Sequence, residues 1–192
     1  MGEVVMNKSF FRLNELLKDS YERILAIDWS YYLGKNIVYD DVGVPKATGL
    51  VAHFVSEPTL GIYTQSYGFL PRPERSVQTV VRKVRLLQEN MSCFASLEVR
   101  NPTTNDWGGA IRSLANSDCV EYYAVSGLPE IGDHLLVAHM MRECGLLSVS
   151  DWEVVTGCYS DHMTKARNDA GISPESYMEL EEDIHHALSL DW

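Results

Sequence analysis

The sequence lacks any long apolar run: across 192 residues, no uninterrupted stretch approaches the roughly 18 residues that a membrane-spanning helix needs. Residues 1–8 also lack the basic region, apolar stretch and small-residue cleavage site of a secretion signal. These two absences argue against a membrane protein and against an exported one. We therefore expect a soluble protein of the cytoplasm with no membrane partner.

Cysteine pairs and basic charge are also scarce. The four cysteines are widely spaced and form no Cys-x-x-Cys pair, so neither a thiolate metal site nor a redox pair is expected. The formal net charge of −11 repels phosphate backbones at long range, which argues against nucleic acid as a partner. One basic cluster exists, and such charge runs are more often the solvated face of a helix than an anion site. It comprises Arg72, Arg75, Arg82, Lys83 and Arg85, of which Arg82 and Lys83 would point to different sides.

What is present favours one α+β domain. A chain of this length can bury a substantial core without disulfides or metals, and 45% of its residues are hydrophobic. We predict a single domain over residues 1–145. Residues 146–192 are predicted to form an acidic, partly helical C-terminal extension that packs on the core or on a partner.

The apolar periodicities predict the element order α-β-β-α-β-β-β-α. Helical spacing indicates helices over residues 10–21, 73–90 and 129–144. β-rich runs with short connections indicate an antiparallel five-stranded sheet flanked by these helices. The predicted strands are residues 49–55, 60–69, 92–99, 108–114 and 119–126.

Three weaker patterns complete the assignment of elements. Residues 23–28 are expected to form a short strand, and Asp28 is expected to cap a second helix that continues to Ile37. Residues 152–155 are expected to be weakly structured. Ser173 and Pro174 predict the cap and first residue of a last helix.

Two glycine-containing motifs mark a candidate ligand site. Gly108 and Gly109 open a predicted strand, where glycine permits a positive φ or the close approach of a backbone or a ligand. The run Val-Ser-Gly-Leu-Pro, residues 125–129, ends a strand and begins a helix, so backbone amides beside a partial positive charge point outward. Both a site for an anionic or polar ligand and a simple structural turn are consistent with this pattern.

Ser126, Asp133 and His134 are the residue types of nucleophilic catalysis, but their spacing argues against a catalytic triad. Asp133 and His134 are adjacent on a helix and diverge by about 100°, so this acid cannot orient this histidine. No Gly-x-Ser-x-Gly motif surrounds Ser126. The sequence therefore predicts no catalytic residues, and whether the chain is an enzyme stays open.

The histidines do not predict a metal site. His134 and His139 are five residues apart, which misses the i,i+4 spacing of a helical metal pair. His185 and His186 are adjacent and diverge in the same way. No metal ligand is predicted.

The two motifs carry a resemblance to a known family. The runs Trp-Gly-Gly-Ala-Ile (residues 107–111) and Val-Ser-Gly-Leu-Pro-Glu-x-x-Asp-His (residues 125–134) resemble the haem-degrading-domain family of GlcG and HbpS type. The basic run Val-Arg-Lys-Val-Arg, residues 81–85, is similar to the long basic helix of one subgroup. The resemblance covers about residues 28–144. It implies an antiparallel sheet flanked by helices, a homo-oligomer, and a pocket that binds haem or another small cofactor.

The chain departs from that subgroup at both of its histidines. A histidine precedes the Gly-Gly pair in the subgroup, whereas Trp107 stands there in this chain. Gly-His-Ser-Ser follows the long helix in the subgroup, whereas this chain has Asn-Met-Ser-Cys at residues 90–93. Imidazole is the usual axial ligand of haem iron, although Tyr, Met and Cys also serve. The cofactor is therefore unknown, with haem as one candidate.

The junction and the resemblance together predict an oligomeric domain that binds a small organic or anionic ligand and has no evident catalytic site. The predicted ligand-binding residues are Gly108, Gly109, Ser126, Gly127 and His134. The glycines would allow close backbone approach, and Ser126 and His134 would donate or accept hydrogen bonds. Two alternatives stay open: a protein that binds or degrades haem or another cofactor, and a structural or adaptor protein that acts through its oligomer surface and acidic extension.

Overall fold

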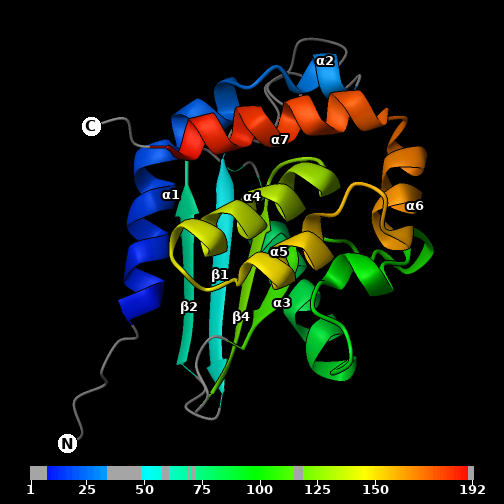
Figure 1. Cartoon of the computed structure of the whole chain (residues 1–192). Helices are drawn as coiled ribbons and strands as arrows, with labels where there is room; N and C mark the ends of the chain where they lie inside the picture. The colour runs from blue at the N-terminus through cyan, green and yellow to red at the C-terminus, as the bar shows by residue number, and fades with distance from the viewer. Residues whose placement is uncertain are drawn as a thin grey trace, which may run out of the picture.

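The computed structural model describes residues 8–33, 49–57, 61–68, 70, 72–114 and 119–189. It is an α+β structure in which helices flank one antiparallel sheet (Figure 1). The predicted fold class is therefore confirmed. Among the described residues, no helix combines the length and the apolar character that crossing a bilayer requires.

The sheet has four strands in the order β2-β1-β4-β3. The predicted hairpin is present, with β1 (Leu50–Glu57) antiparallel to β2 (Gly61–Tyr67). On its other side β1 pairs antiparallel with β4 (Val120–Ser126), which in turn pairs antiparallel with β3 (Ala110–Ser113). The first and last of these strands along the chain, β1 and β4, thus form the middle of the sheet.

The prediction of a fifth strand at residues 92–99 is wrong. This segment makes a single isolated bridge, between Ala95 and Ile111, and then turns into the 3-10 helix η1 (Ser96–Val99). The Glu98 carboxylate explains the turn, because it accepts hydrogen bonds of 2.7 Å from the backbone N–H groups of both Phe94 and Ala95. A side chain that returns to its own backbone in this way competes with strand pairing.

The strand predicted at residues 23–28 is also wrong, because helix α1 (Lys8–Ala26) continues through it. The buried positions Leu13, Leu17 and Ile24 form one helical stripe, so Ile24 belongs to the same face as the earlier leucines. Asp28 does cap the short helix α2 (Trp29–Leu33), since its Oδ1 accepts a 3.0 Å hydrogen bond from the Tyr31 N–H. The predicted continuation to Ile37 lies outside the described residues.

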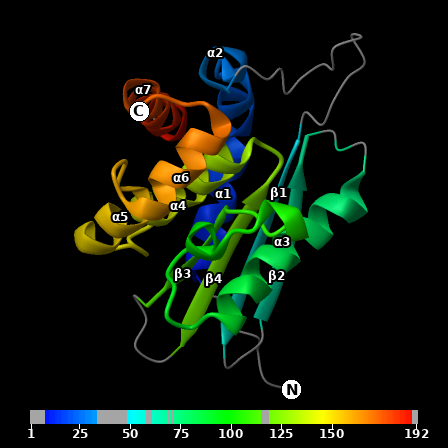
Figure 2. The same ribbon diagram turned by 90° about the vertical axis from the view of Figure 1, so that its right-hand side faces the viewer.

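The sheet separates two apolar layers. Val51 and Val55 of β1 pack with α3 (Pro73–Glu89), whereas Ala52 and Phe54 pack into the larger core on the other face. This alternation follows from the two-residue period of a strand. Figure 2 shows α3 on one side of the sheet and α1 and α4 (Glu130–Glu143) on the other.

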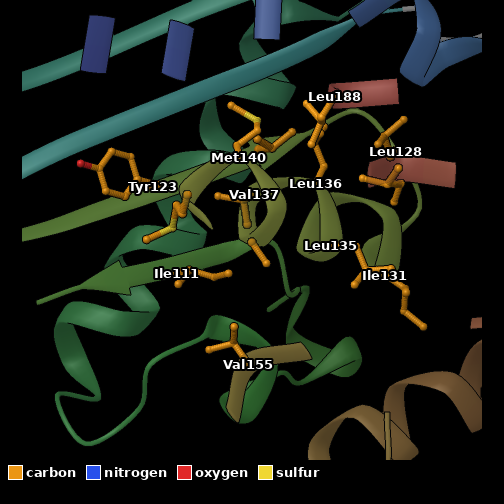
Figure 3. Packing of buried hydrophobic residues seen from close by; sticks show 14 of the residues in the cluster. Ile111, Tyr123, Leu128, Ile131, Leu135, Leu136, Val137, Met140, Val155 and Leu188 are labelled. Atoms are coloured by element: carbon orange, nitrogen blue, oxygen red, sulfur yellow. The ribbon is translucent and has the colours of Figure 1, made fainter. Parts of the chain in front are cut away.

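Helix α4 lies at the centre of the larger core. Its residues from Ile131 to Met141 are all buried, because the sheet, α1, and the C-terminal helices surround it. Figure 3 shows Leu135, Leu136, Val137 and Met140 of this helix among Tyr123, Ile111, Val155 and Leu188. A helix that is apolar on nearly every face requires such burial.

The C-terminal segment forms three helices. Residues 152–155, expected to be weakly structured, belong to α5 (Val149–Thr156), and α6 (Asp161–Ala170) follows. The last helix, α7 (Pro174–Leu188), begins as predicted, with the Ser173 hydroxyl accepting from the Ser176 N–H at 3.2 Å.

Helix α7 packs against α1 and α4 (Figure 1). Tyr177, Leu180 and Ile184 are fully buried in the same apolar cluster as α4. The Tyr177 hydroxyl donates a 2.6 Å hydrogen bond to the Thr156 carbonyl, which ties α7 to α5. The C-terminal helices thus contribute to the main core.

Candidate functional site

A cavity of about 670 Å³ lies where β4 leads into α4. The middle of α3, the loop that follows η1, and α6 supply its other walls. Its polar lining consists of Thr79, Lys83, Arg100, Trp107, Ser126, Glu130, Asp133 and Asp169. Its apolar lining consists of Pro102, Leu128, Pro129, Ile131, Ala166 and Ala170.

The Val-Ser-Gly-Leu-Pro motif shapes the turn at this cavity. Gly127 has a φ of +144°, and a Cβ there would lie 2.4 Å from the Gly49 carbonyl oxygen, so only glycine fits. Pro129 then caps α4, which begins at Glu130. The first-turn amides of α4 lack intrahelical partners and carry the positive end of the helix dipole, and they begin at the cavity wall.

A buried ion pair lies beside this turn. Lys83 of α3 and Asp133 of α4 are 3% and 4% exposed, and the Lys83 Nζ is 2.8 Å from the Asp133 Oδ2. The same ammonium donates to the Val125 carbonyl at 2.8 Å. The other carboxylate oxygen of Asp133 accepts a 2.9 Å hydrogen bond from the Leu128 N–H. Burial raises the pKa of Asp133 to about 6, whereas the Lys83 charge and the hydrogen bonds from Lys83 and Leu128 favour the ionised carboxylate.

The Gly-Gly pair makes room for this ion pair. Gly109 has a φ of +104°, and a Cβ there would lie 2.7 Å from both the Lys83 Nζ and the Asp133 Cβ. A Cβ at Gly108 would lie 2.5 Å from the Leu97 side chain. The glycines therefore allow the start of β3 to pass directly over the charged groups, as the close-approach prediction for this pair requires.

A second set of charges holds α4 and α6 together. The Arg100 guanidinium contacts the Glu130 carboxylate through Nε at 2.9 and 3.0 Å, and it also pairs with Asp169 of α6. The Glu130 Oε1 also accepts a 2.7 Å hydrogen bond from the Gly108 N–H. The Arg100 side chain is 5% exposed, whereas Asp169 is 50% exposed and lies at the rim. Arg100 thus fixes two walls of the cavity at once.

On the inner wall of the cavity the hydrogen-bonding capacity left open is of the donor type, whereas at the rim Asp169 keeps one carboxylate oxygen, Oδ1, without a partner among the described residues. Asp133 and Glu130 already accept from Lys83, Leu128, Arg100 and Gly108. Lys83 has three N–H donors, of which two are used within the described part of the chain. In that same part of the chain, neither the Ser126 hydroxyl nor the Trp107 indole N–H has a partner.

The structure places the predicted site residues in four different situations. Ser126 lines the cavity, and Gly108 and Gly109 lie behind its charged wall. Gly127 shapes the turn but packs against Gly49. His134 does not line the cavity: its Nε2 is 2.6 Å from the Val155 carbonyl of α5, on the far side of α4.

Sequence reasoning missed Lys83, Arg100 and Glu130 as site residues. The four arginines of the basic cluster are exposed, as the solvated-face interpretation predicts, but Lys83 is buried. The sequence pattern could have predicted the burial of Lys83, because this residue falls on the same helical stripe as Val80, Val84 and Leu87. A charge on an apolar stripe requires a buried partner.

Three buried histidines lie outside the cavity, and two of them, His134 and His139, belong to α4. Burial lowers the pKa of His134 to about 4 and that of His139 to about 3. Neither ring nitrogen of His139 has a hydrogen-bond partner among the described residues, and the ring packs edge-on against Trp152 with a centroid distance of 4.5 Å. Both histidines are therefore neutral parts of the core.

The lining does not fit haem ligation. Its described residues include no His, Met, Cys or Tyr, and the lysine among them, Lys83, is held in the ion pair with Asp133. Within the described ranges, no group of three His, Cys, Asp or Glu side chains could hold a metal ion. The cavity therefore offers hydrogen-bond donors and apolar walls rather than iron ligands.

No protein-family model matches the chain, and comparisons with curated proteins and with solved structures also gave no match. The resemblance to the haem-degrading-domain family therefore stays a prediction.

Gly109→Ala is expected to destabilise the fold by more than about 3 kcal/mol, because it adds backbone strain and displaces a buried ion pair. Gly145→Ala is the matched control: its φ is +72°, but a Cβ there meets nothing within 4 Å. The control should cost only about 1 kcal/mol. Urea unfolding measures both, and equal losses would show that Gly109 matters only for its φ.

His139→Phe should reduce the loss of stability in acid. The depressed pKa of His139 means that unfolding takes up a proton below pH 6.5, so its contribution to stability is lost as the pH falls toward 3. The free energy of unfolding of the variant, measured relative to that of the wild type, should therefore be about 2 kcal/mol higher at pH 5 than at pH 8. His186→Phe is the control, because it makes the same substitution at an exposed position of α7. Unfolding curves with the same pH dependence for wild type and His139→Phe would refute the assignment.

Proposed function

We propose that this chain is a binding domain for a small organic molecule that carries an anionic group, a carboxylate or a phosphate. The observation that carries the proposal is made at the inner wall of the cavity, where the Asp133 and Glu130 carboxylates already accept hydrogen bonds while the donors of Ser126, Lys83 and Trp107 are open. Such a wall favours a ligand that presents acceptors. The proposal concerns binding, because the acidic side chains that face the cavity are held in ion pairs.

Three features support an anionic head group near Ser126. The Ser126 hydroxyl and the third N–H of Lys83 are open donors on one side of the cavity. The first turn of α4 begins at the same wall, and a helix N-terminus favours negative charge by about 0.3–1 kcal/mol. These groups converge on the strand-to-helix turn that the sequence motif marks.

The remaining lining supports an apolar or aromatic body. Trp107 offers a ring face and one N–H donor, and Leu128, Ile131 and Ala166 supply apolar surface. The volume of about 670 Å³ lies within the range of roughly 300–1,000 Å³ that is usual for small-molecule sites. A flat ring that bears a carboxylate matches both parts of the cavity.

Four fragments test this proposal: benzoate, phenyl phosphate, benzamide and benzamidine. Saturation-transfer NMR and calorimetric titration should show binding of the two anions, weaker binding of neutral benzamide, and none of the benzamidinium cation. Ser126→Ala should weaken benzoate binding about tenfold, since hydrogen bonds to charged groups contribute about 1.5–3 kcal/mol. Ser189→Ala at the end of α7, outside the cavity lining, is the matched control.

Two results would contradict the proposal. One is benzamidine binding as tightly as benzoate, which would mean that the wall does not select for acceptors. The other is equal benzoate affinity for Ser126→Ala and Ser189→Ala, which would place any binding elsewhere.

A further inference from the structure

The two edges of the sheet differ in how they are covered. At the β3 edge, the Arg112 N–H donates to the Phe94 carbonyl at 2.8 Å and the Ala110 N–H donates to the Ser96 hydroxyl at 3.0 Å. The segment before β3 thus occupies that edge. The β2 edge has β1 on its inner side, and no described segment pairs with its outer side.

The outer strand β2 is widely exposed. Ile62 is 65% exposed, and Thr64, Gln65 and Ser66 are exposed as well. Ile62, Thr64 and Ser66 pair with Val55, His53 and Val51, so they share the face of the sheet that α3 covers. Helix α3 packs on β1, β4 and β3, which leaves this part of β2 accessible.

The chemistry of β2 does not protect it from pairing. Exposed edge strands are usually blunted by lysine, proline, a bulge or an inward-pointing charge. No residue between Glu57 and Arg72 is charged, and this is the longest uncharged stretch of the sequence. Within β2, the Gln65 side-chain amide donates to the Ser66 carbonyl at 3.0 Å, which is a contact inside the strand and not with a covering segment.

We propose that the β2 edge is the interface at which two copies of this chain pair, strand to strand and antiparallel. A symmetric dimer uses the same patch on both subunits, and an uncharged strand is compatible with itself. The net charge of −11 on each copy disfavours contacts between charged faces, which leaves this neutral strip as the favoured contact. The two four-stranded sheets then join into one continuous sheet.

The bounds of β2 set the register of this pair. Thr64 is the midpoint of Gly61–Tyr67, so full overlap pairs Thr64 with Thr64 of the second copy. The same register pairs Ile62 with Ser66 of the second copy. A directly opposed threonine pair is favourable in antiparallel sheets, and directly opposed Cβ atoms lie about 4.5–5.5 Å apart.

Cysteine cross-linking tests the register directly. Thr64→Cys should form a disulfide-linked dimer under mild oxidation, identified by mass spectrometry as the residue-64 peptide joined to itself. Ser66→Cys is the matched control, because its two copies would lie about 13 Å apart along the strands, too far for a disulfide. Equal cross-linking of both variants, or cross-linking of neither, would overturn the proposed pairing.

The oligomeric state provides a second readout that introduces no thiol. Light scattering after size exclusion should give the mass of a dimer for the wild type and of a monomer for Ile62→Lys. Val154→Lys, which places the same charge at an exposed apolar position of α5, should remain a dimer. A monomeric wild type, or a dimer that survives Ile62→Lys, would overturn the proposal. Benzoate binding by Ile62→Lys should be unchanged, so failure of the dimer and failure of the ligand site are distinguishable.

Discussion

The buried ion pair between Lys83 and Asp133 is the interaction on which the candidate site depends. It joins α3 and α4, which lie on opposite faces of the sheet, at the point where β3 begins and β4 ends. Two buried charges are tolerated only when they are paired and hydrogen bonded, and here both oxygens of the carboxylate are used. The pair therefore fixes how the strand-to-helix turn sits relative to both helices.

The two glycine-containing motifs lie beside this ion pair and make it possible. Gly109 lacks the Cβ that would collide with the charged groups, Gly108 lacks the Cβ that would collide with Leu97, and the Val-Ser-Gly-Leu-Pro turn presents the Leu128 N–H to Asp133. Arg100 adds a similar link between α4 and α6 through Glu130 and Asp169. Because these contacts use the acceptors, the cavity is left with open donors and apolar walls.

Much of the fold could be predicted from periodicity and capping. The hairpin, the long helix α3, the helix after the proline turn and the Ser173 cap all follow local rules, and they appear as expected. The segment 92–99 could not be predicted in the same way, because a β-rich pattern does not reveal that Glu98 accepts from the preceding backbone. The continuation of α1 through residues 23–26 depends on Ile24, which extends the apolar stripe of Leu13 and Leu17 by two further turns.

The site was less predictable than the fold, for a physical reason. Motifs located the turn and the glycines, but charge pairing between distant residues depends on tertiary packing. Lys83 and Asp133 are 50 residues apart, and only the antiparallel sheet brings their helices together. His134 is the reverse case. Histidine is common in binding sites, so the sequence suggested a ligand-binding role, but this side chain lies in the core, where the Val155 carbonyl accepts its hydrogen bond.

A double-mutant cycle at the ion pair tests the account most directly. The free energies of unfolding of Lys83→Met, Asp133→Asn and the double variant are compared with that of the wild type. Each single change should cost about 3–5 kcal/mol, because it leaves a buried charge unpaired, and the double variant should cost little more than either. Losses that add to within about 0.5 kcal/mol would mean that the two residues act independently, and would contradict the central role given to their pairing.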